Sequence, residues 1–397
     1  MPDILHISPS EFLLKSFKLG RKLYQQGFRP KHTISVWRGG TPVGLGVDAY
    51  YRCHGFFMNH TTIATESYSG IGQRGSVNVK GLEHVINVVC REDDLLIIDD
   101  VYESGNTIQA IVETIRKKAK ANAPRKIVVG TLHSKPVKHQ YKELEIISVE
   151  QIAGDVWIDY PHELADLATP EDPQDCLIRA KDQTTWDLLH NDLPTPPKLL
   201  NTGKFNYLNP AQLHYDSLKL GLNIARENKY VPDFLIALWP GGISAGLPIH
   251  EVYKYLHKKG EVDSVPDHIS LNTTKTHLTY RSNIIGMEYL VNSIEKHNTI
   301  LIVEVAFKSG RLISDVITKL KEKLRRNLTL DNIKIATVYY NPSDDSTWTV
   351  KPFKKAPDFF WSKVDHTMVY PNNLYRLKNI LQMLPEISPE LYEILYK

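Results

Sequence analysis

The stretch Leu95-Leu96-Ile97-Ile98-Asp99-Asp100-Val101-Tyr102-Glu103-Ser104-Gly105-Asn106-Thr107 decides the fold of this chain. An apolar run that ends in two carboxylates predicts a buried parallel strand, which delivers Asp99 and Asp100 to the carboxyl edge of a sheet. Open α/β sheets bind their ligands at that edge. Apolar residues at positions 108, 111, 112 and 115 follow the stretch, and their spacing predicts a helix.

A small-residue turn that opens a helix predicts an anion site, because the first backbone N–H groups are unpaired and the helix dipole favours negative charge. We therefore expect Ser104, Gly105, Asn106 and Thr107 to hold a phosphate beside the two acids. The alternative is an ordinary helix cap, which uses the same donors. Two adjacent acids next to a phosphate would repel it unless they bind its hydroxyls or its metal, which favours a ligand site.

Composition limits the function classes that the chain can serve. Its 397 residues, 42% of them hydrophobic, predict two globular domains, because single cores rarely grow past about 250–300 residues. The formal net charge of +3 gives no support to general polyanion binding, so we expect no nucleic-acid partner. Three scattered cysteines argue against a disulfide framework or a zinc site. Without a leader pattern or a long apolar run, we expect a soluble, cytoplasmic protein with no membrane partner.

The other predicted elements of the first half follow in order. A helix is expected over residues 10–27, a strand over 33–37 with a turn from Arg38, and a second helix to about residue 54. The Thr-, Ser- and Gly-rich residues 58–76, around Ser67-Tyr68, predict a mobile active-site lid. A further strand over 126–132 leads to Lys135, and residues 155–161 close this half.

The second half repeats the first. Ser8-Pro9 has its counterpart in Asn209-Pro210 at an offset of 201, and Trp37 in Trp239 at an offset of 202. Asp99-Asp100 corresponds to Glu304-Val305 at an offset of 205. Offsets that rise slowly are what loop insertions produce, so we predict a tandem duplication. Its expected parts are a domain over 1–168, a proline-punctuated linker over 169–205 and a second domain over 206–397.

The first half resembles the purine phosphoribosyltransferases, most closely the xanthine-guanine and hypoxanthine-guanine enzymes. The opening stretch is similar to that family's phosphoribosyl pyrophosphate (PRPP) signature, and Arg38-Gly39, Ser67-Tyr68, Lys135-Pro136 and Trp157-Ile158 follow in the right order. The resemblance covers about residues 5–165, with a weaker echo over 205–375. It implies an α/β protein of two tandem type I phosphoribosyltransferase-like domains. Each would be a mainly parallel five-stranded sheet flanked by helices, with a small hood.

The resemblance also implies how PRPP is held. Asp99 and Asp100 would face its ribose hydroxyls and Mg²⁺, the latter directly or through water. The turn from Ser104 through Gly105 and Asn106 to Thr107 would cradle the 5′-phosphate. Arg38 and Gly39 would meet the pyrophosphate, and Ser67 and Tyr68 would lie on the loop that closes over the site.

For the base, the resemblance implies that Lys135 donates to a 6-oxo group, that Trp157 stacks on the ring, and that the backbone of Ile158 meets its edge. Glu103 stands where most relatives have Asp, and would handle the proton on N7. A solvated lysine and a half-buried core aromatic are the alternatives for Lys135 and Trp157 taken singly.

The second copy departs where chemistry would need it. Asp100 is replaced by Val305, Glu103 by Lys308, Arg38 by Pro240 and Lys135 by Asn341. We therefore expect a degenerate domain that serves structure or regulation. Because family members commonly dimerise, the resemblance implies an internal pseudo-dimer of the two halves. Assembly of the whole chain into a further homo-oligomer stays open.

The function so indicated is Mg²⁺-dependent transfer of the phosphoribosyl group from PRPP to hypoxanthine, guanine or xanthine, which yields a nucleoside 5′-monophosphate and pyrophosphate in purine salvage. Two alternatives stay open. One is a non-catalytic regulatory protein that senses PRPP or a nucleotide. The other is phosphoribosyl transfer to a modified base in a specialised pathway.

Overall fold

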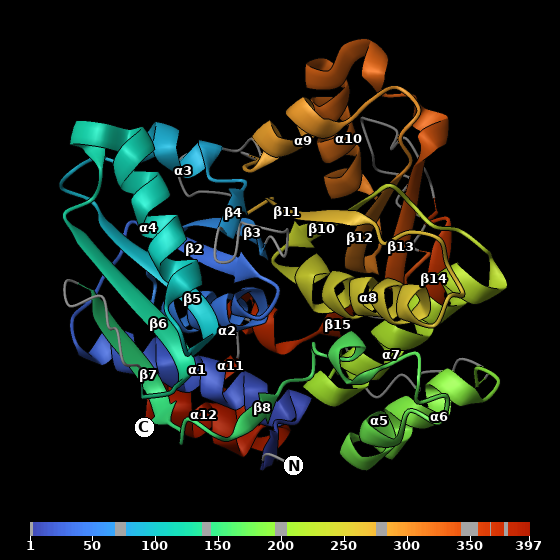
Figure 1. Cartoon of the computed structure of the whole chain (residues 1–397), viewed down its shortest axis with the longest axis horizontal. Helices are drawn as coiled ribbons and strands as arrows, with labels where there is room; N and C mark the ends of the chain where they lie inside the picture. Colours follow the sequence, from blue (N-terminus) through green and yellow to red (C-terminus); the bar gives the residue numbers. More distant parts are fainter. Residues whose placement is uncertain are drawn as a thin grey trace. The chain divides into compact units, whose positions relative to one another are not determined.

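The chain divides into two α/β units. The computed structural model describes residues 3–67, 77–136, 144–194, 205–274, 284–342, 356–365, 367–376 and 380–397. One unit consists of Met1–Tyr160 with Pro371–Lys397, and the other of Pro161–Tyr370. Both contain parallel sheets, which confirms the α/β class (Figure 1). Within the described ranges, no helix is long and apolar enough to cross a membrane.

The first unit is built on a six-stranded sheet in the order β4-β3-β2-β5-β6-β7. Its neighbours are parallel except β4, which runs antiparallel to β3. The expected sheet of five thus gains an edge strand, in which Val77 and Val79 alternate with polar residues. The strands are β2 (His32–Trp37), β3 (Asn59–Ser67), β4 (Val77–Lys80), β5 (Asp94–Tyr102), β6 (Lys126–Ser134) and β7 (Glu145–Gln151).

The predicted lid over residues 58–76 is wrong for its first part, because residues 59–67 form strand β3. The prediction weighed Thr and Ser as loop residues. β-branched residues such as Thr61, Thr62 and Ile63 instead fit a pleated strand, and β3 pairs along β2 with Ile63 opposite Val36.

Helices cover both faces of this sheet. α3 (Glu83–Val88) and α4 (Asn106–Ala119) form one core cluster with Leu95 and Ile97 of β5. On the opposite face lie α1 (Pro9–Gln25), which packs against β6 and β7, and α2 (Gly40–Cys53), which packs against β5. The oxygen of Ser8 caps α1 by accepting a hydrogen bond from the Glu11 N–H at 3.2 Å.

A separate two-stranded parallel sheet pairs β1 (Ile4–His6) with β8 (Trp157–Asp159). His6 Nδ1 lies 2.8 Å from Asp159 Oδ2 across it. The segment after Tyr370 returns to this unit, since α12 (Pro389–Tyr396) packs on α1 and α11 (Ile380–Ile387). This differs from the expected second domain over 206–397, because the apolar side of α12 buries Leu391 and Leu395 in the first unit.

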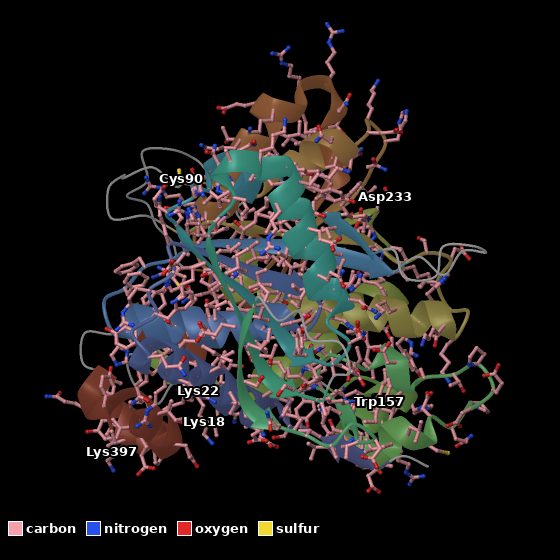
Figure 2. The ribbon with its side chains drawn as sticks, turned by 60° about the vertical axis from the view of Figure 1, so that its left-hand side comes forward. Lys18, Lys22, Cys90, Trp157, Asp233 and Lys397 are labelled. Atoms are coloured by element: carbon pink, nitrogen blue, oxygen red, sulfur yellow. The ribbon has the colours of Figure 1, made fainter. Side chains whose placement is uncertain are left out.

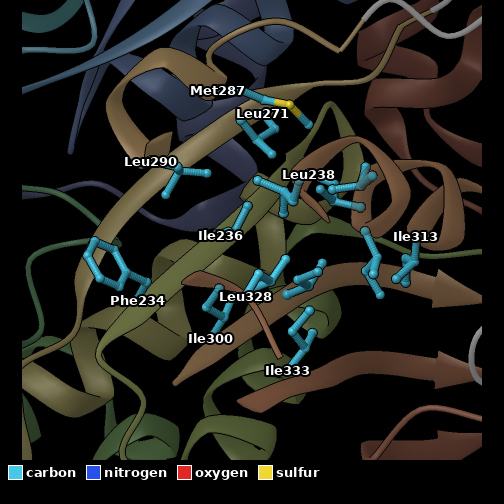
Figure 3. Packing of buried hydrophobic residues seen from close by; sticks show 14 of the residues in the cluster. Phe234, Ile236, Leu238, Leu271, Met287, Leu290, Ile300, Ile313, Leu328 and Ile333 are labelled. Carbon is cyan, nitrogen blue, oxygen red and sulfur yellow. The ribbon is translucent and has the colours of Figure 1, made fainter. Parts of the chain in front are cut away.

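The second unit has a five-stranded parallel sheet in the order β11-β10-β12-β13-β14. Figure 3 shows its core, in which side chains such as Ile236, Leu271 and Ile300 pack with helices α9 and α10. The strands are β10 (Phe234–Trp239), β11 (Asp267–Asn272), β12 (Ile300–Phe307), β13 (Ile333–Tyr340) and β14 (Phe359–Lys363), with β9 (Phe205–Tyr207) and β15 (Thr367–Val369) paired apart. The principal helices are α7 (Pro210–Leu222), α8 (Gly241–Lys258), α9 (Met287–Ser293) and α10 (Arg311–Leu324).

Part of the expected linker is ordered within the second unit. It holds α5 (Cys176–Lys181) and α6 (Gln183–His190). The buried carboxylate of Asp175 ties these helices to α8, because it accepts from Tyr255 at 2.7 Å and lies 2.6 Å from the Lys259 ammonium. Proline spacing alone does not predict such a buried polar contact.

Candidate functional site

The two acids of the opening stretch lie near the carboxyl end of β5, as predicted. Asp99 and Asp100 are half-buried. Asp99 Oδ1 accepts the Asp100 N–H at 3.1 Å, and Asp100 Oδ1 accepts the Val101 N–H at 2.8 Å. Burial and the neighbouring Asp100 carboxylate raise the pKa of Asp99 well above its usual range. A site that crowds two carboxylates in this way favours a cation beside them.

The predicted phosphate turn connects β5 to α4. Gly105 is the N-cap residue of α4 and has φ of 74°, a left-handed conformation that favours glycine. A side chain here would also collide, because a Cβ would stand 2.7 Å from the Tyr102 hydroxyl. Ser104 Oγ accepts the Asn106 N–H at 3.4 Å. Glycine thus lets Ser104, Asn106 and Thr107 stand at the open N-terminus of a 14-residue helix.

A second turn lies beside the acids. Arg38 and Gly39 follow β2, which pairs with β5, and Thr41 Oγ1 donates to the Arg38 carbonyl at 2.8 Å. Gly40 opens α2 so close to β5 that a Cβ on it would overlap the Ile98 carbonyl and stand 2.9 Å from Asp99 Cα. Gly40 therefore holds the Arg38-Gly39 turn against the acids, a role that the sequence analysis did not assign.

Two residues with separate predicted roles form an ion pair. Lys135 Nζ lies 2.7 Å from Glu103 Oε1, and the Lys135 N–H donates to the Tyr102 carbonyl at 2.9 Å. The two meet because β5 and β6 are parallel neighbours that end together, with Tyr102 opposite Ser134. The Lys135 side chain is 7% exposed and that of Glu103 57%.

Tyr160 and His133 are site residues that the sequence analysis missed. The Tyr160 hydroxyl lies 2.7 Å from His133 Nδ1 and donates to the Asp100 carbonyl at 3.3 Å. Tyr160 follows β8, so it ties the strand of Trp157 to the end of β5. A lone Tyr-Pro pair carries no sequence signal for such a contact.

Polar side chains continue this network away from the site. His133 Nε2 lies 3.6 Å from Glu150 Oε2, which accepts from the Lys15 ammonium at 2.5 Å. Burial, and then the positive charge of Lys15, lowers the pKa of His133 to about 4. His133 is therefore neutral at neutral pH and serves as a hydrogen-bonding group rather than a charge.

A cavity of about 790 Å³ is lined in part by Lys135. Tyr102, Ser134, Lys135 and Pro136 form the part of its wall near the ends of β5 and β6, and β7 supplies much of the rest. Lys135 thus lines this cavity as well as contacting Glu103.

The remaining predicted residues that the structure describes lie on other elements of the first unit. Trp157 (labelled in Figure 2) is 50% exposed on β8, and Ile158 is buried on the same strand with its backbone opposite Leu5. β8 belongs to the small sheet and not to the six-stranded one. Ser67 is the last residue of β3. Tyr68 lies outside the described residues.

The acids fit the expected Mg²⁺ ion in their chemistry. Mg²⁺ takes oxygen ligands and binds through one or two carboxylates together with substrate phosphates. Asp99 and Asp100 supply carboxylate oxygens between the phosphate turn and the Arg38-Gly39 turn. Burial and the neighbouring Asp100 carboxylate disfavour the charged form of Asp99, and a cation bound there would oppose both effects.

No protein-family model and no curated protein matches the chain. Among solved structures, it is similar to a hypothetical protein from Neisseria gonorrhoeae with bound ppGpp, at 21% identity over 41% of this chain and 89% of that one, with a TM-score of 0.32. It is similar to a purine phosphoribosyltransferase from Pyrococcus horikoshii at 19% identity over 40% and 93% of the two chains, with a TM-score of 0.30. The Helicobacter pylori xanthine-guanine-hypoxanthine phosphoribosyltransferase matches at 19% identity over 40% and 92%, with a TM-score of 0.32. Purine phosphoribosyltransferases thus occur among its structural matches.

Proposed function

We propose that the first unit transfers the phosphoribosyl group of PRPP to a 6-oxopurine, namely hypoxanthine, guanine or xanthine, with release of pyrophosphate. The observation that carries the proposal is the meeting of three features where β5 and β6 end. These are the acids Asp99 and Asp100, the glycine turn that opens α4, and the Glu103–Lys135 pair. Together they offer an anion site, a cation site and a donor for an oxo group within one region.

Each group has a part in holding PRPP. The N–H groups that open α4, with Ser104 and Thr107, bind the 5′-phosphate, and Asp99 and Asp100 accept from the ribose hydroxyls. Arg38 and the Gly39 backbone bind the pyrophosphate. Mg²⁺ would supply neutralisation of the pyrophosphate charge when bound at the acids.

At the base, Lys135 donates to the 6-oxo oxygen, Trp157 stacks on the ring and Glu103 takes the N7 proton as the bond to ribose C1 forms. The transition state resembles an oxocarbenium ion. The protein's contribution is therefore to align base and ribose, to screen the leaving group and to exclude water.

An assay of pyrophosphate release from PRPP and Mg²⁺ with hypoxanthine, guanine and xanthine tests this function. Asp100→Asn and Lys135→Ala should each lower the rate by at least about 10²-fold, since positioned groups of this kind contribute about 10²–10⁴. Glu304→Gln is the matched control, because Glu304 occupies in β12 the position that Asp99 occupies in β5, and it should leave the rate unchanged. Full activity in both first-unit variants would contradict the assignment.

We also propose that the second unit is a degenerate copy of the first. The order β11-β10-β12-β13-β14 matches β3-β2-β5-β6-β7, and both orders are parallel throughout. Gly310 opens α10 with φ of 66°, as Gly105 opens α4. Val305 and Lys308 replace Asp100 and Glu103, which removes a carboxylate and reverses a charge. We accordingly place the one active centre in the first unit.

A non-catalytic sensor of PRPP or a nucleotide is the second candidate. The Glu103–Lys135 pair favours it, because the two groups that would handle a base already satisfy each other. Calorimetry that detects PRPP binding, combined with no turnover of any of the three bases, would support the sensor over the enzyme. Turnover of only a modified base would keep the chemistry and change the acceptor.

A further inference from the structure

We propose that Glu103 is the residue that determines which ligands can enter at Lys135. Its carboxylate holds the Lys135 ammonium in the free protein, at 2.7 Å, and a ligand enters by putting an oxygen of its own in place of that carboxylate oxygen. This exchange, of a ligand oxygen for the Glu103 carboxylate oxygen at the Lys135 ammonium, is inferred from the ion pair alone. The identity of the ligand, a ring with an oxo group, rests on the proposed function.

The exposures of the two side chains decide which partner moves. Lys135 is 7% exposed and Glu103 57%. A buried ammonium that loses its partner costs several times more than a carboxylate that returns to water. The Lys135 backbone is also held, because its N–H donates to the Tyr102 carbonyl at 2.9 Å. Opening of the pair therefore means that the exposed Glu103 side chain moves off the ammonium while Lys135 keeps its place.

The length of the glutamate makes this contact. An aspartate at position 103 would end about 1.5 Å short, the length of one carbon–carbon bond. From the present 2.7 Å, the shorter carboxylate would leave hydrogen-bond range of an ammonium that stays in place. Glu103 thus adds a requirement to the site that an aspartate would not impose, namely that the ligand must compete with an internal carboxylate.

The competition selects a chemical class. An entering edge must present an acceptor to the ammonium, since Lys is a donor only. A ring N–H near that acceptor recovers part of the lost ion pair by donating to Glu103, as N7–H does in the proposed function. A ring edge that presents an oxo group near an N–H meets both demands. A ring with an amino group at that point offers the ammonium a donor and leaves it unpaired, which disfavours it by about 10²-fold or more.

Labelling of lysine amines in the full chain tests the exchange without any assay of activity. The protein reacts briefly with an amine-acetylating reagent, and mass spectrometry measures modification of Lys135 relative to the exposed Lys18 (Figure 2). We expect Lys135 to react about tenfold faster in Glu103→Ala than in the natural chain, the factor typical of a lost charge-assisted hydrogen bond. Added formate should restore protection in this variant, and chloride at equal ionic strength should not.

Glu103→Asp is the second variant, because it keeps the charge and removes only the reach; it should expose Lys135 as Glu103→Ala does. Glu145→Ala is the matched control, since Glu145 lines the same cavity as Lys135, and it should leave Lys135 labelling unchanged. Circular dichroism of each variant shows whether the chain is folded. Wild-type labelling of Lys135 in both Glu103 variants, or no protection by formate, overturns the proposal.

The same measurement separates this proposal from the proposed function. Hypoxanthine should protect Lys135 in Glu103→Ala, and adenine should not. Protection by formate with none by hypoxanthine, guanine or xanthine upholds the exchange and overturns the purine acceptor. Equal protection by adenine and hypoxanthine overturns the selection by an oxo group.

Discussion

The hydroxyl of Tyr160 and Nδ1 of His133 lie 2.7 Å apart, and the same hydroxyl donates to the carbonyl of Asp100 at 3.3 Å. Three separate parts of the first unit meet at this one oxygen: the end of β5, the end of β6 and the residue that follows β8. The contact links the strand that carries Trp157 to the strand that carries the acids. Loss of this contact should therefore loosen both β8 and the end of β5.

Tyr160→Phe should loosen the ends of β5 and β8 together. The ring keeps its edge contact with Phe12, with centroids 5.5 Å apart, so the change removes only the hydroxyl. We expect the local opening free energy of these strands to fall by about 1 kcal/mol, the net value of a buried hydrogen bond. Hydrogen exchange followed by mass spectrometry measures it. Tyr392→Phe in α12 is the control, and equal effects of the two changes would contradict a specific role for Tyr160.

The stability of the first unit should depend on pH through His133. Its pKa in the folded chain is about 4, below the usual value of 6.5. Between these values the unfolded chain binds more protons, so stability is full above pH 6.5 and is lost as pH falls towards 4. The expected loss is about 3 kcal/mol. Denaturation curves across this range should show a weaker pH dependence in His133→Gln. His257→Gln, at an exposed position, should keep the original dependence.

Gly105→Ala should harm the phosphate turn by strain and by collision. The residue has φ of 74°, and a Cβ would meet the Tyr102 hydroxyl at 2.7 Å. Gly27 has nearly the same φ, 76°, with nothing within 4 Å of an added Cβ. Gly27→Ala should therefore cost about 1 kcal/mol for strain alone. Gly105→Ala should cost more in melting experiments and should weaken PRPP binding measured by calorimetry. Equal costs would show that the Tyr102 contact is unimportant.

Leu395→Ala should destabilise the first unit. Leu395 belongs to this unit although it follows Tyr160, the end of the unit's larger segment, by more than two hundred residues. Leu395 is 3% exposed in α12, which packs on α1. Loss of a buried leucine typically costs about 2–5 kcal/mol. Faster hydrogen exchange is expected in α1 and not in β10 of the second unit. Leu177→Ala, at a 41% exposed position, should change neither.

The sequence predicts the strand-turn-helix at Asp99 because the signal is local. An apolar run, two acids, a glycine and a helical repeat all lie within about twenty residues, and the structure places β5 and α4 there. The same holds for α1, where Ser8-Pro9 and an apolar repeat predict a helix that the structure has over Pro9–Gln25. Thr-rich β3 was misjudged, because side-chain polarity was weighed above the strand preference of β-branched residues.

Contacts between distant residues could not be predicted in this way. Glu103 and Lys135 were both identified, but their ion pair depends on β5 and β6 being neighbours of matched length. Tyr160 was given no role, because its hydroxyl meets His133 and the Asp100 carbonyl only through the turn that follows β8. α12 is amphipathic, and amphipathicity says that a helix is covered without saying by which part of the chain.

The division of the first unit into Met1–Tyr160 and Pro371–Lys397 has a consequence for how the protein is made. On the ribosome, the helix that covers α1 is synthesised only after all of Pro161–Tyr370. The nascent first unit must therefore wait with part of its apolar surface uncovered while the second unit, continuous in sequence, is already complete. During translation the later unit can finish folding before the earlier one, which leaves the candidate catalytic half as the part more exposed to chaperones and to premature termination.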